Sequence, residues 1–381
     1  MDATTTVEQF DHFIPLSTQQ LTVALRQSGL GAAQMDVVHK LHQILSFEFY
    51  LKLRTLKKLY LPFDPDQEIN ETLQHPASSK RCIDAIRQLL EQANYSELNQ
   101  QQIEYALQKT SPYGLEIHVD LSAFADVSLF YQGKSRQTIT VRDWKKLFIG
   151  KKQVELIRYR RLFLLLRYHD SAAYPGIQLK LFKDILRPDL EMLFPECKIK
   201  MKVFDKIKLA ITGGGGTLGG LFATISKITA AINPWTIAVA IGGFALLLWR
   251  QVSKIFIQKT RYMATLARNL YFHNLDNNAG ALNYLIDLAR QQEIRELTLA
   301  YAMINLKPLK NAQQLDSACE QWLMENFNRS TDFDIEDAID KLRRFDLLNE
   351  ASENLSCKDP QAIARQLDAR WLRFMQRDAS D

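Results

Sequence analysis

The hydrophobic pattern of the chain contains two long uncharged stretches that follow each other directly. Residues 209–226 carry no charged side chain, Lys227 interrupts, and residues 228–249 again carry none. Each stretch has about the length of ~20 residues that a helix needs to cross ~30 Å of hydrocarbon. The pattern therefore predicts a two-helix transmembrane hairpin over residues 207–254, with its turn near Asn233.

Basic residues crowd both outer ends of the predicted hairpin. Such residues stay on the cytoplasmic side of a membrane, and each is attracted to anionic headgroups by about 1 kcal/mol. We therefore expect both large soluble parts on the cytoplasmic side, with anionic lipids at the basic flanks. A hydrophobic hairpin buried in a large soluble core is the alternative. The flanking residues are Lys198, Lys200, Lys202, Lys206 and Lys208 before the spans and Arg250, Lys254, Lys259 and Arg261 after them.

Glycines of the first span occur four residues apart, which lets two helices approach closely in lipid. The expected partner is the second span or another protomer, so the pattern leaves room for a homo-oligomer. Trp235 and Trp249 bracket the second span, as interfacial aromatic residues do. Lys227 belongs near the far interface, because a lysine at mid-membrane costs about 2.5–3.5 kcal/mol on insertion scales. The glycine pairs are Gly215 with Gly219 and Gly216 with Gly220.

Helical periodicity dominates the first part of the chain. Ser17 and Gln20 have the spacing of a capping box, and the helix that they open should end before Gly29. Apolar residues at intervals of three to four predict one long helix after it, and two shorter helices follow. The expected helices cover residues 18–27, 35–60, 79–93 and 97–109, in an N-terminal helical module over residues 1–112.

Strand patterns appear next, in residues 113–206. Apolar and polar residues alternate from Leu115 to Leu121, as they do in a half-buried strand, and the two short apolar segments that follow are its expected partners. A continuous apolar run at Phe163–Leu166 suits a central strand. We expect a small mixed sheet with helices. Its strands would cover residues 115–121, 127–131, 138–141, 163–166 and 177–181.

A helical connector with further helices is expected over residues 255–310. The last part of the chain then shows two helices, a short turn and a final helix. This order in residues 311–381 resembles a winged-helix domain, with Thr331 or Asp332 as the cap of its second helix. In such domains the second helix enters the major groove of DNA. Here that helix opens with acidic residues, which repel phosphates. We therefore expect no specific nucleic acid, and a protein partner for this domain. The acidic residues are Asp334, Glu336, Asp337 and Asp340.

Composition fits soluble domains around one membrane element rather than a multi-span transporter, because the apolar share of 46% is ordinary. The net charge of +5 is modest, and much of it lies beside the spans. Four scattered cysteines contain no Cys-x-x-Cys pair, so neither a disulfide framework nor a zinc knuckle is indicated, and a reducing compartment fits. They are Cys82, Cys197, Cys319 and Cys357.

The first residues carry no targeting pattern. Met1–Phe10 include Asp2 and Glu8 and lack both a basic start and an apolar core, so neither a secretory signal nor a transit peptide is expected. An organellar membrane is therefore the less expected location.

Carboxylates gather at the junction between the expected sheet and the hairpin. Paired carboxylates can divide acid and base roles when their environments separate their pKa values. Acidic residues that follow Pro188 also suit the first turn of a helix, which is the structural alternative. The junction carboxylates are Asp184, Asp189, Glu191 and Asp205.

Three further polar patterns are weak. The run Asp276-Asn277-Asn278 suggests a polar site, but these residue types are ordinary helix caps. His39 and His42 have no third metal ligand at usable spacing and are expected on the surface. The glycine run of the hairpin lacks the Gly-Lys-Ser/Thr ending of a phosphate loop. We therefore predict no catalytic residue, no metal site and no cofactor.

Two long motifs resemble an uncharacterised membrane-protein family. They are LKLFKDILRPDLEMLFPECKIKMKVFDKIK from Leu179 to Lys208 and NLYFHNLDNNAGALNYLIDLARQQEIRELTLAY from Asn269 to Tyr301, on either side of the hairpin. The segment HFIPLSTQQL from His12 is similar to the amino-terminal signature of the same family, which has a domain of unknown function and includes transmembrane protein 143. The resemblance implies a two-span membrane protein of bacteria and of organelles of bacterial descent. It implies no known reaction. Because no transit peptide is expected, we favour the bacterial cytoplasmic (inner) membrane as the location of this integral protein.

Together these patterns predict an α+β membrane protein that acts as a membrane-anchored binding, scaffold or regulatory protein. One alternative is a membrane-associated enzyme with a site near Asp184–Asp205, and another is an oligomeric conduit through the glycine-rich hairpin. Converging carboxylates in a deep pocket would favour the enzyme. An acidic or apolar groove on the terminal domain would favour binding.

Overall fold

The described part of the chain divides into two compact units. Unit 1 comprises Met1–Ile103, Leu121–Arg187 and Leu275–Asp381, and unit 2 comprises Glu104–Asp120 and Pro188–Asn274. The computed structural model describes residues 8–10, 13–67, 76–108, 116–119, 121–143, 150–169, 176–195, 197–200, 264, 268, 271–349 and 354–378.

The predicted hairpin over residues 207–254 lies outside the described residues. None of the helices in the described ranges is both long and apolar enough to cross a membrane. The residues singled out in the hairpin therefore have no structural description: Gly215, Gly216, Gly219, Gly220, Lys227, Trp235 and Trp249.

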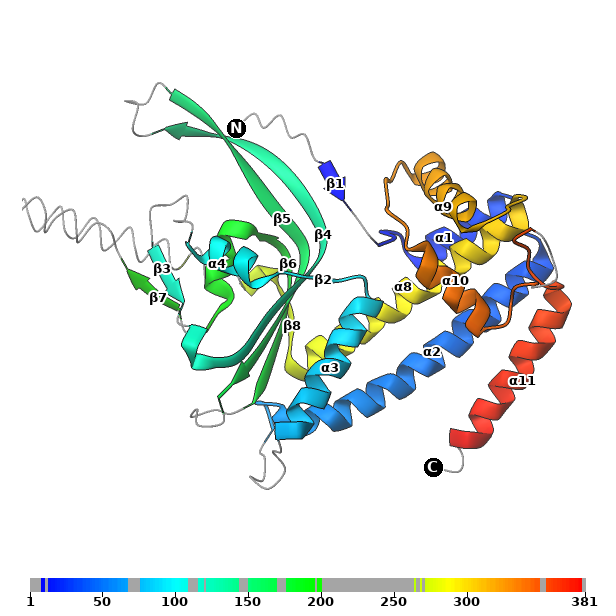
Figure 1. Cartoon of the computed structure of the whole chain (residues 1–381), viewed down its shortest axis with the longest axis horizontal. Coiled ribbons are helices and arrows are strands. Elements are labelled where there is room, and N and C mark those ends of the chain that lie inside the picture. Colours follow the sequence, from blue (N-terminus) through cyan, green and yellow to red (C-terminus); the bar gives the residue numbers. More distant parts are fainter. Residues whose placement is uncertain are drawn as a thin grey trace, which may run out of the picture. The chain divides into compact units, whose positions relative to one another are not determined.

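A curved antiparallel sheet forms one side of unit 1 (Figure 1). Its strand order is β1-β4-β5-β6-β8, and the short β2 also pairs with β4. The predicted mixed sheet is corrected, because every pair with a defined register is antiparallel. The strands are β1 (Glu8–Phe10), β2 (Ser96–Glu97), β4 (Phe124–Asp143), β5 (Gly150–Tyr168), β6 (Ile177–Leu186) and β8 (Asn274–Asn277).

Strand β5 confirms the central strand predicted from the run Phe163–Leu166, since it pairs with β4 on one edge and β6 on the other. The side chains of Phe163 and Leu165 face the helices, whereas those of Leu162, Leu164 and Leu166 face the opposite side of the sheet. All five side chains are fully buried. Both faces of the strand are thus shielded from water, which explains why the run shows no polar alternation.

The predicted pairing of the strand at residues 115–121 is wrong. It forms β3 (Glu116–Val119) in unit 2 and pairs with β7 (Cys197–Lys200). Its expected partners both belong to the single long strand β4. One edge of β4 is covered along its length by β5, and β1 and β2 take positions on the other edge. A strand has only two hydrogen-bonding edges. Because β5, β1 and β2 take both edges of β4, β3 pairs elsewhere.

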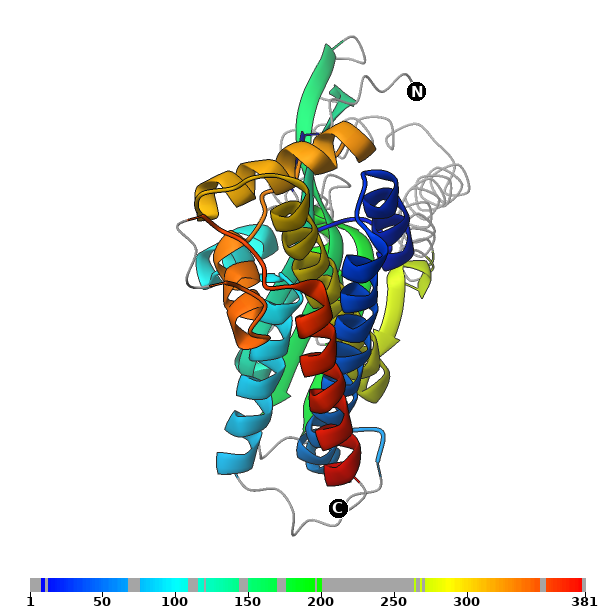
Figure 2. The ribbon, with the colours of Figure 1, turned by 90° about the vertical axis from the view of Figure 1, so that its right-hand side faces the viewer.

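Helices α2 and α8 run side by side through unit 1 (Figures 1 and 2). The capping box at Ser17 and Gln20 is confirmed at the start of α1, as is the long helix that follows. The predicted connector helices instead form the single helix α8, which contains no proline and no glycine after Gly280. The helices so far are α1 (Thr18–Gln27), α2 (Ala32–Tyr60), α3 (Pro76–Gln92), α4 (Gln100–Gln108) and α8 (Asn278–Leu306).

Two hydrophobic clusters share α2 and α8. One packs the second half of α2, α3 and the first half of α8 against the sheet. The other packs α1 and the remaining halves of α2 and α8 against the terminal helices. Those helices are α9 (Ala312–Phe327), α10 (Ile335–Arg344) and α11 (Pro360–Asp378). Short 3-10 helices complete the described elements: η1 (Leu61–Phe63), η3 (Leu121–Ala123) and η5 (Arg187–Leu193).

The C-terminal residues have the predicted order of elements. Helices α9 and α10 are followed by two isolated β-bridges, Leu309 with Leu355 and Leu348 with Cys357, and then by α11. The cap of α10 is Asp334 rather than Thr331 or Asp332. The ranges predicted as separate domains, 1–112 and 311–381, lie largely or wholly in unit 1, and their boundaries stay predictions.

Candidate functional site

Buried polar side chains occupy the middle of α8, where the two hydrophobic clusters meet. Helix α8 is surrounded by other elements at this level, so its polar positions have no access to water. Such groups remain stable only when protein partners satisfy them. The buried polar residues of this stretch are Gln292, Glu293, Arg295, Glu296 and Thr298.

Lys341 of α10 is the centre of an ion cluster on this stretch. Its ammonium lies 2.7 Å from Glu296 Oε2 and 3.2 Å from Glu293 Oε2, and it also pairs with Asp337. Burial by itself lowers the pKa of Lys341, but the three carboxylates raise it above its ordinary value. The amine therefore stays protonated at neutral pH and holds α10 against α8.

The second oxygen of Glu296 connects this cluster to the turn after α3. Glu296 Oε1 accepts hydrogen bonds from Asn94 Nδ2 at 2.8 Å and from Gln292 Nε2 at 2.7 Å. Complete burial raises the pKa of Glu296, whereas the nearby ammonium of Lys341 lowers it. Every oxygen of the buried carboxylate thus has a partner, as a buried charge requires.

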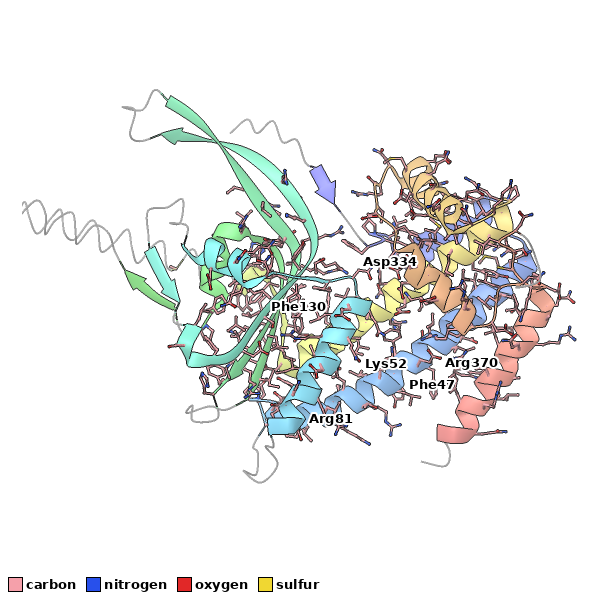
Figure 3. All side chains as sticks on the ribbon, in the orientation of Figure 1. Phe47, Lys52, Arg81, Phe130, Asp334 and Arg370 are labelled. Carbon is pink, nitrogen blue, oxygen red and sulfur yellow. The ribbon has the colours of Figure 1, made fainter. Side chains whose placement is uncertain are left out.

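An acidic pocket opens beside Asn94. It has a volume of about 510 Å³ and lies between the turn after α3 and the start of α10. Figure 3 marks Asp334 at that start. The residues that line it include no lysine, arginine or histidine. They are Glu91, Asn94, Tyr95, Ser96, Asp332, Phe333, Asp334, Ile335 and Glu336, a set that we call the acidic pocket.

The start of α10 explains why carboxylates gather there. Asp334 caps the helix by accepting a hydrogen bond from the backbone N–H of Asp337 at 3.2 Å. Acidic side chains in a first turn are stabilised by the helix dipole. The negative charge also acts on nearby Asp316, whose pKa is raised first by burial and then by the charges of Glu320, Asp332 and Asp334. The pocket therefore suits a cationic group.

The run Asp276-Asn277-Asn278 forms the joint between β8 and α8. Asn278 is buried, accepts a hydrogen bond from the Leu179 N–H of β6 at 3.1 Å, and donates to Asp66 Oδ2 at 2.8 Å. Asp276 accepts from the Asn277 N–H at 2.9 Å. Asn277 is exposed and makes no capping bond with its side chain. The run thus lies at the start of α8, but its N-cap residue Asn277 makes no side-chain capping bond, and the contacts of Asn278 join the helix to β6 and Asp66 instead.

The junction carboxylates are not described as one site. Asp184 is exposed on β6 in unit 1, with a left-handed φ of 53°. Asp189 lies half-buried in η5 of unit 2, where burial raises its pKa against the lowering effect of His273. The side chain of Glu191 and all of Asp205 lie outside the described residues. Within the described ranges, no group of three or more His, Cys, Asp or Glu residues is placed to hold a metal ion.

Sequence analysis found half of the acidic pocket. It identified the acidic start of α10, but not Glu91 and Asn94, which come from a distant part of the chain. Lys341 was not singled out from the sequence. The available signal was spacing, because Lys341 lies among Ala338 and Leu342 on the apolar face of α10. A lysine at such a position requires a buried carboxylate partner.

Residues 125–280 match the DUF3754 family, which is described as a protein of unknown function. This range contains most of β4, β5, β6, β8 and the first turn of α8, and it includes the residues of the predicted hairpin. The acidic pocket lies outside it. No solved structure matches the chain.

Proposed function

We propose that this chain is a membrane-anchored binding or scaffold protein whose acidic pocket takes a basic segment of a protein partner. The observation that carries the binding proposal is the pocket itself, in which Glu91, Asp332, Asp334 and Glu336 line a volume of about 510 Å³ without a basic side chain. Complementary charge gives such a surface selectivity and fast association. An acidic or apolar groove on the terminal domain was the feature expected to favour binding, and Asp332, Asp334 and Glu336 of the acidic pocket belong to that domain.

The membrane part of the proposal is supported by the path of the chain. Unit 1 contains residues up to Arg187 and again from Leu275, so the chain returns to the unit that it left. β8 takes its place next to β6, and Asn278 bonds to Leu179. Two segments that share one sheet lie on the same side of a bilayer. An intervening membrane segment must therefore cross an even number of times or dip in and return, as the proposed hairpin over residues 207–254 does.

The match to the DUF3754 family overlaps both long motifs around the hairpin. We also propose that the chain is related to the family of transmembrane protein 143 through these two motifs, Leu179–Lys208 and Asn269–Tyr301. The proposed location is the bacterial cytoplasmic membrane, with the soluble parts on its cytoplasmic side and anionic headgroups at the basic flanks.

A protein partner fits the C-terminal elements better than DNA does. Their order, with bridges at Leu309–Leu355 and Leu348–Cys357, supports a winged-helix-like domain in which α10 takes the place of the recognition helix. The three basic residues of α10 already have acidic partners: Lys341 is buried, Arg343 pairs with Asp340, and Arg344 pairs with Glu48. Phosphate contacts need available cations.

The binding proposal is tested with two fluorescent peptides, one of alternating arginine and serine and one of alternating glutamate and serine. Anisotropy is measured on the full chain in mild detergent. Only the arginine peptide should bind, and less tightly at high salt. In the double variant Asp334→Asn, Glu336→Gln its Kd should rise about tenfold. Asparagine keeps the cap of α10, so the variant removes charge without removing the helix start.

Asp340→Asn is the matched control for this experiment. Asp340 lies on α10 but outside the pocket and is largely exposed, so its replacement should change Kd by about twofold at most. Equal affinity for both peptides, or an unchanged Kd in the double variant, would contradict the proposal.

A further inference from the structure

A second groove lies between α2 and α3, and α8 forms its floor. Its volume of about 370 Å³ falls within the range of small-molecule sites, roughly 300–1,000 Å³. The α2 residues that line it, from Glu48 to Leu59, extend over about 16 Å at 1.5 Å per residue. Apolar side chains make up its walls: Leu51, Leu56, Leu59, Ala85, Leu89 and Ile286. We call this the α2–α3 groove.

Lys52 of α2 forms the polar end of the groove (Figure 3). Its ammonium donates to Gln92 Oε1 of α3 at 3.0 Å and lies 4.5 Å from the ring centre of Phe49. None of the carboxylates that the structure describes lies within ion-pair distance of it. Burial lowers the pKa of Lys52, so its charge is incompletely solvated.

The nearby carboxylates are held by other cations. Glu48 also lines the groove, but Arg344 binds it at 3.1 Å and Arg370 at 2.9 Å. Glu293 acts on Lys52 from a greater distance and is held by Lys341 at 3.2 Å. The carboxylates of Glu48 and Glu293 thus act on Lys52 only from beyond ion-pair distance, and each already has a cation in contact with it.

The volume limits the apolar part of a ligand. A protein cavity of about 150 Å³ holds one benzene molecule, so the groove has room for roughly fifteen carbon-sized atoms. That is enough for one acyl chain of about twelve carbons with its carboxylate and too little for the two chains of a phospholipid. A partner helix would need a longer and wider groove than one defined by two turns of α3.

We infer that the α2–α3 groove binds a fatty acid of about twelve carbons, with its chain along the apolar walls and its carboxylate on Lys52. The carboxylate supplies the counter-ion that Lys52 lacks among the described residues, and the chain covers side chains that the groove leaves open to solvent. This inference goes beyond the peptide-binding function proposed above and does not depend on it.

The test uses an analogue of dodecanoate, the fatty acid of about twelve carbons that fits this volume, with a diazirine in its chain and an alkyne at its end. Membranes that contain the full chain are incubated with it and illuminated, and labelled peptides are identified by mass spectrometry. Label should appear on peptides of α2 and α3. A matched probe with an alcohol in place of the carboxylate should label the same peptides of the unaltered chain more weakly. This comparison needs no variant, so it does not depend on the folding of one.

Two substitutions separate the head-group contact from the chain contact. Lys52→Met should reduce labelling by the acid about tenfold and leave labelling by the alcohol unchanged, because only the charged bond is lost. Ala85→Phe fills the groove and should abolish labelling by both probes. The controls are Arg54→Met on α2 and Ala369→Phe on α11, both exposed positions outside the groove, and neither should alter labelling.

Three results would overturn the inference. They are label confined to other parts of the chain, full labelling of Ala85→Phe, and equal loss of both probes in Lys52→Met. Because the measurement concerns peptides of α2 and α3, it gives the same answer whether or not residues 207–254 cross a membrane. Its failure is therefore distinct from a failure of the proposed membrane anchor.

Discussion

Removal of Lys341 should strongly destabilise the fold, because three carboxylates face its ammonium. Replacement by methionine leaves Glu293 and Glu296 buried without their counter-ion. We expect Lys341→Met to lower the free energy of unfolding by about 3–5 kcal/mol, measured by urea unfolding of the full chain in mild detergent. Arg343→Met, at an exposed position of the same helix, should change it by about 0.5 kcal/mol or less. Equal losses in the two variants would contradict the assignment.

The loss caused by Lys341→Met should depend on pH. Without the ammonium, burial is left to raise the folded-state pKa of Glu296 above its unfolded value of about 4.3. The folded variant then binds a proton more tightly than the unfolded chain, so acid favours folding. The deficit relative to the unaltered protein should be full at neutral pH and shrink as the pH falls toward about 4.3. A deficit that stays constant over this range would show that the lost packing, and not the charge, is responsible.

His42 gives a second prediction at this scale and a correction. It was expected on the surface, but it is half-buried and lies 2.8 Å from Thr298 Oγ1 through Nε2. Burial, followed by the charges of His39 and Arg290, lowers its pKa to about 4. Because the folded-state pKa lies below the unfolded value of about 6.5, stability is full above pH 6.5 and declines as the pH falls toward 4. NMR titration should find the His42 imidazole still neutral at pH 5.5, and a midpoint above 6 would refute this.

At the scale of elements, the joint between β6 and α8 depends on Asn278. Its backbone has a left-handed φ of 47°, and its side chain bonds to Leu179 and Asp66. Asn278→Gly keeps the conformation and removes both bonds, which should destabilise the fold by about 1–3 kcal/mol. Asn278→Ala adds backbone strain, so it should be less stable than the glycine variant by about 1 kcal/mol. Thermal unfolding measures both, and equal stability of the two variants would show that the conformation carries no strain.

Sequence patterns predicted those elements whose signal is local. Helix α1 begins at its capping box, and the apolar spacing of α2 and α11 defines each to within a few residues. Strand partners were not predictable in the same way, because β3 and β4 both alternate and nothing in their residues excludes a pairing. The pairing of β3 depends instead on which strands compete for the edges of β4, and β5, β1 and β2 occupy both edges.

In the candidate sites, too, local patterns were predictable from the sequence, whereas contacts between distant parts of the chain were not. The acidic start of α10 was visible in sequence, since Asp334 and Glu336 are neighbours on one helix. Glu91 and Asn94 join them only through the packing of α3 and α10 on α8, which no local pattern reveals. The α2–α3 groove was missed for a similar reason. Lys52 looks like an ordinary surface lysine until α3 covers it, when Gln92 becomes its hydrogen-bond partner.

At the scale of the whole molecule, the chain is organised by its return to unit 1. Residues before Arg187 and after Leu275 contribute to one sheet and to both hydrophobic clusters. Helix α8 comes after the proposed membrane segment in sequence and yet packs on α2 and α3, which precede that segment. Unit 1 is therefore complete only after the proposed membrane segment has been synthesised, so both flanks of that segment must remain in one compartment.

The position of Lys227 decides between a full crossing and a re-entrant loop, both of which satisfy this requirement. A lysine at mid-membrane costs about 2.5–3.5 kcal/mol on insertion scales, whereas one near the end of a span can extend to the headgroups. A two-span hairpin therefore puts Lys227 near the far interface, close to its turn at Asn233. In a chain without native cysteines, Lys227→Cys should react with an impermeant thiol reagent added from the far side. Lys206→Cys and Lys259→Cys are the controls, and each should react only after permeabilisation, because the basic flanks stay on the cytoplasmic side. Reaction of Lys227→Cys solely from the side of unit 1 would replace the two-span hairpin with a loop that enters and leaves the same leaflet.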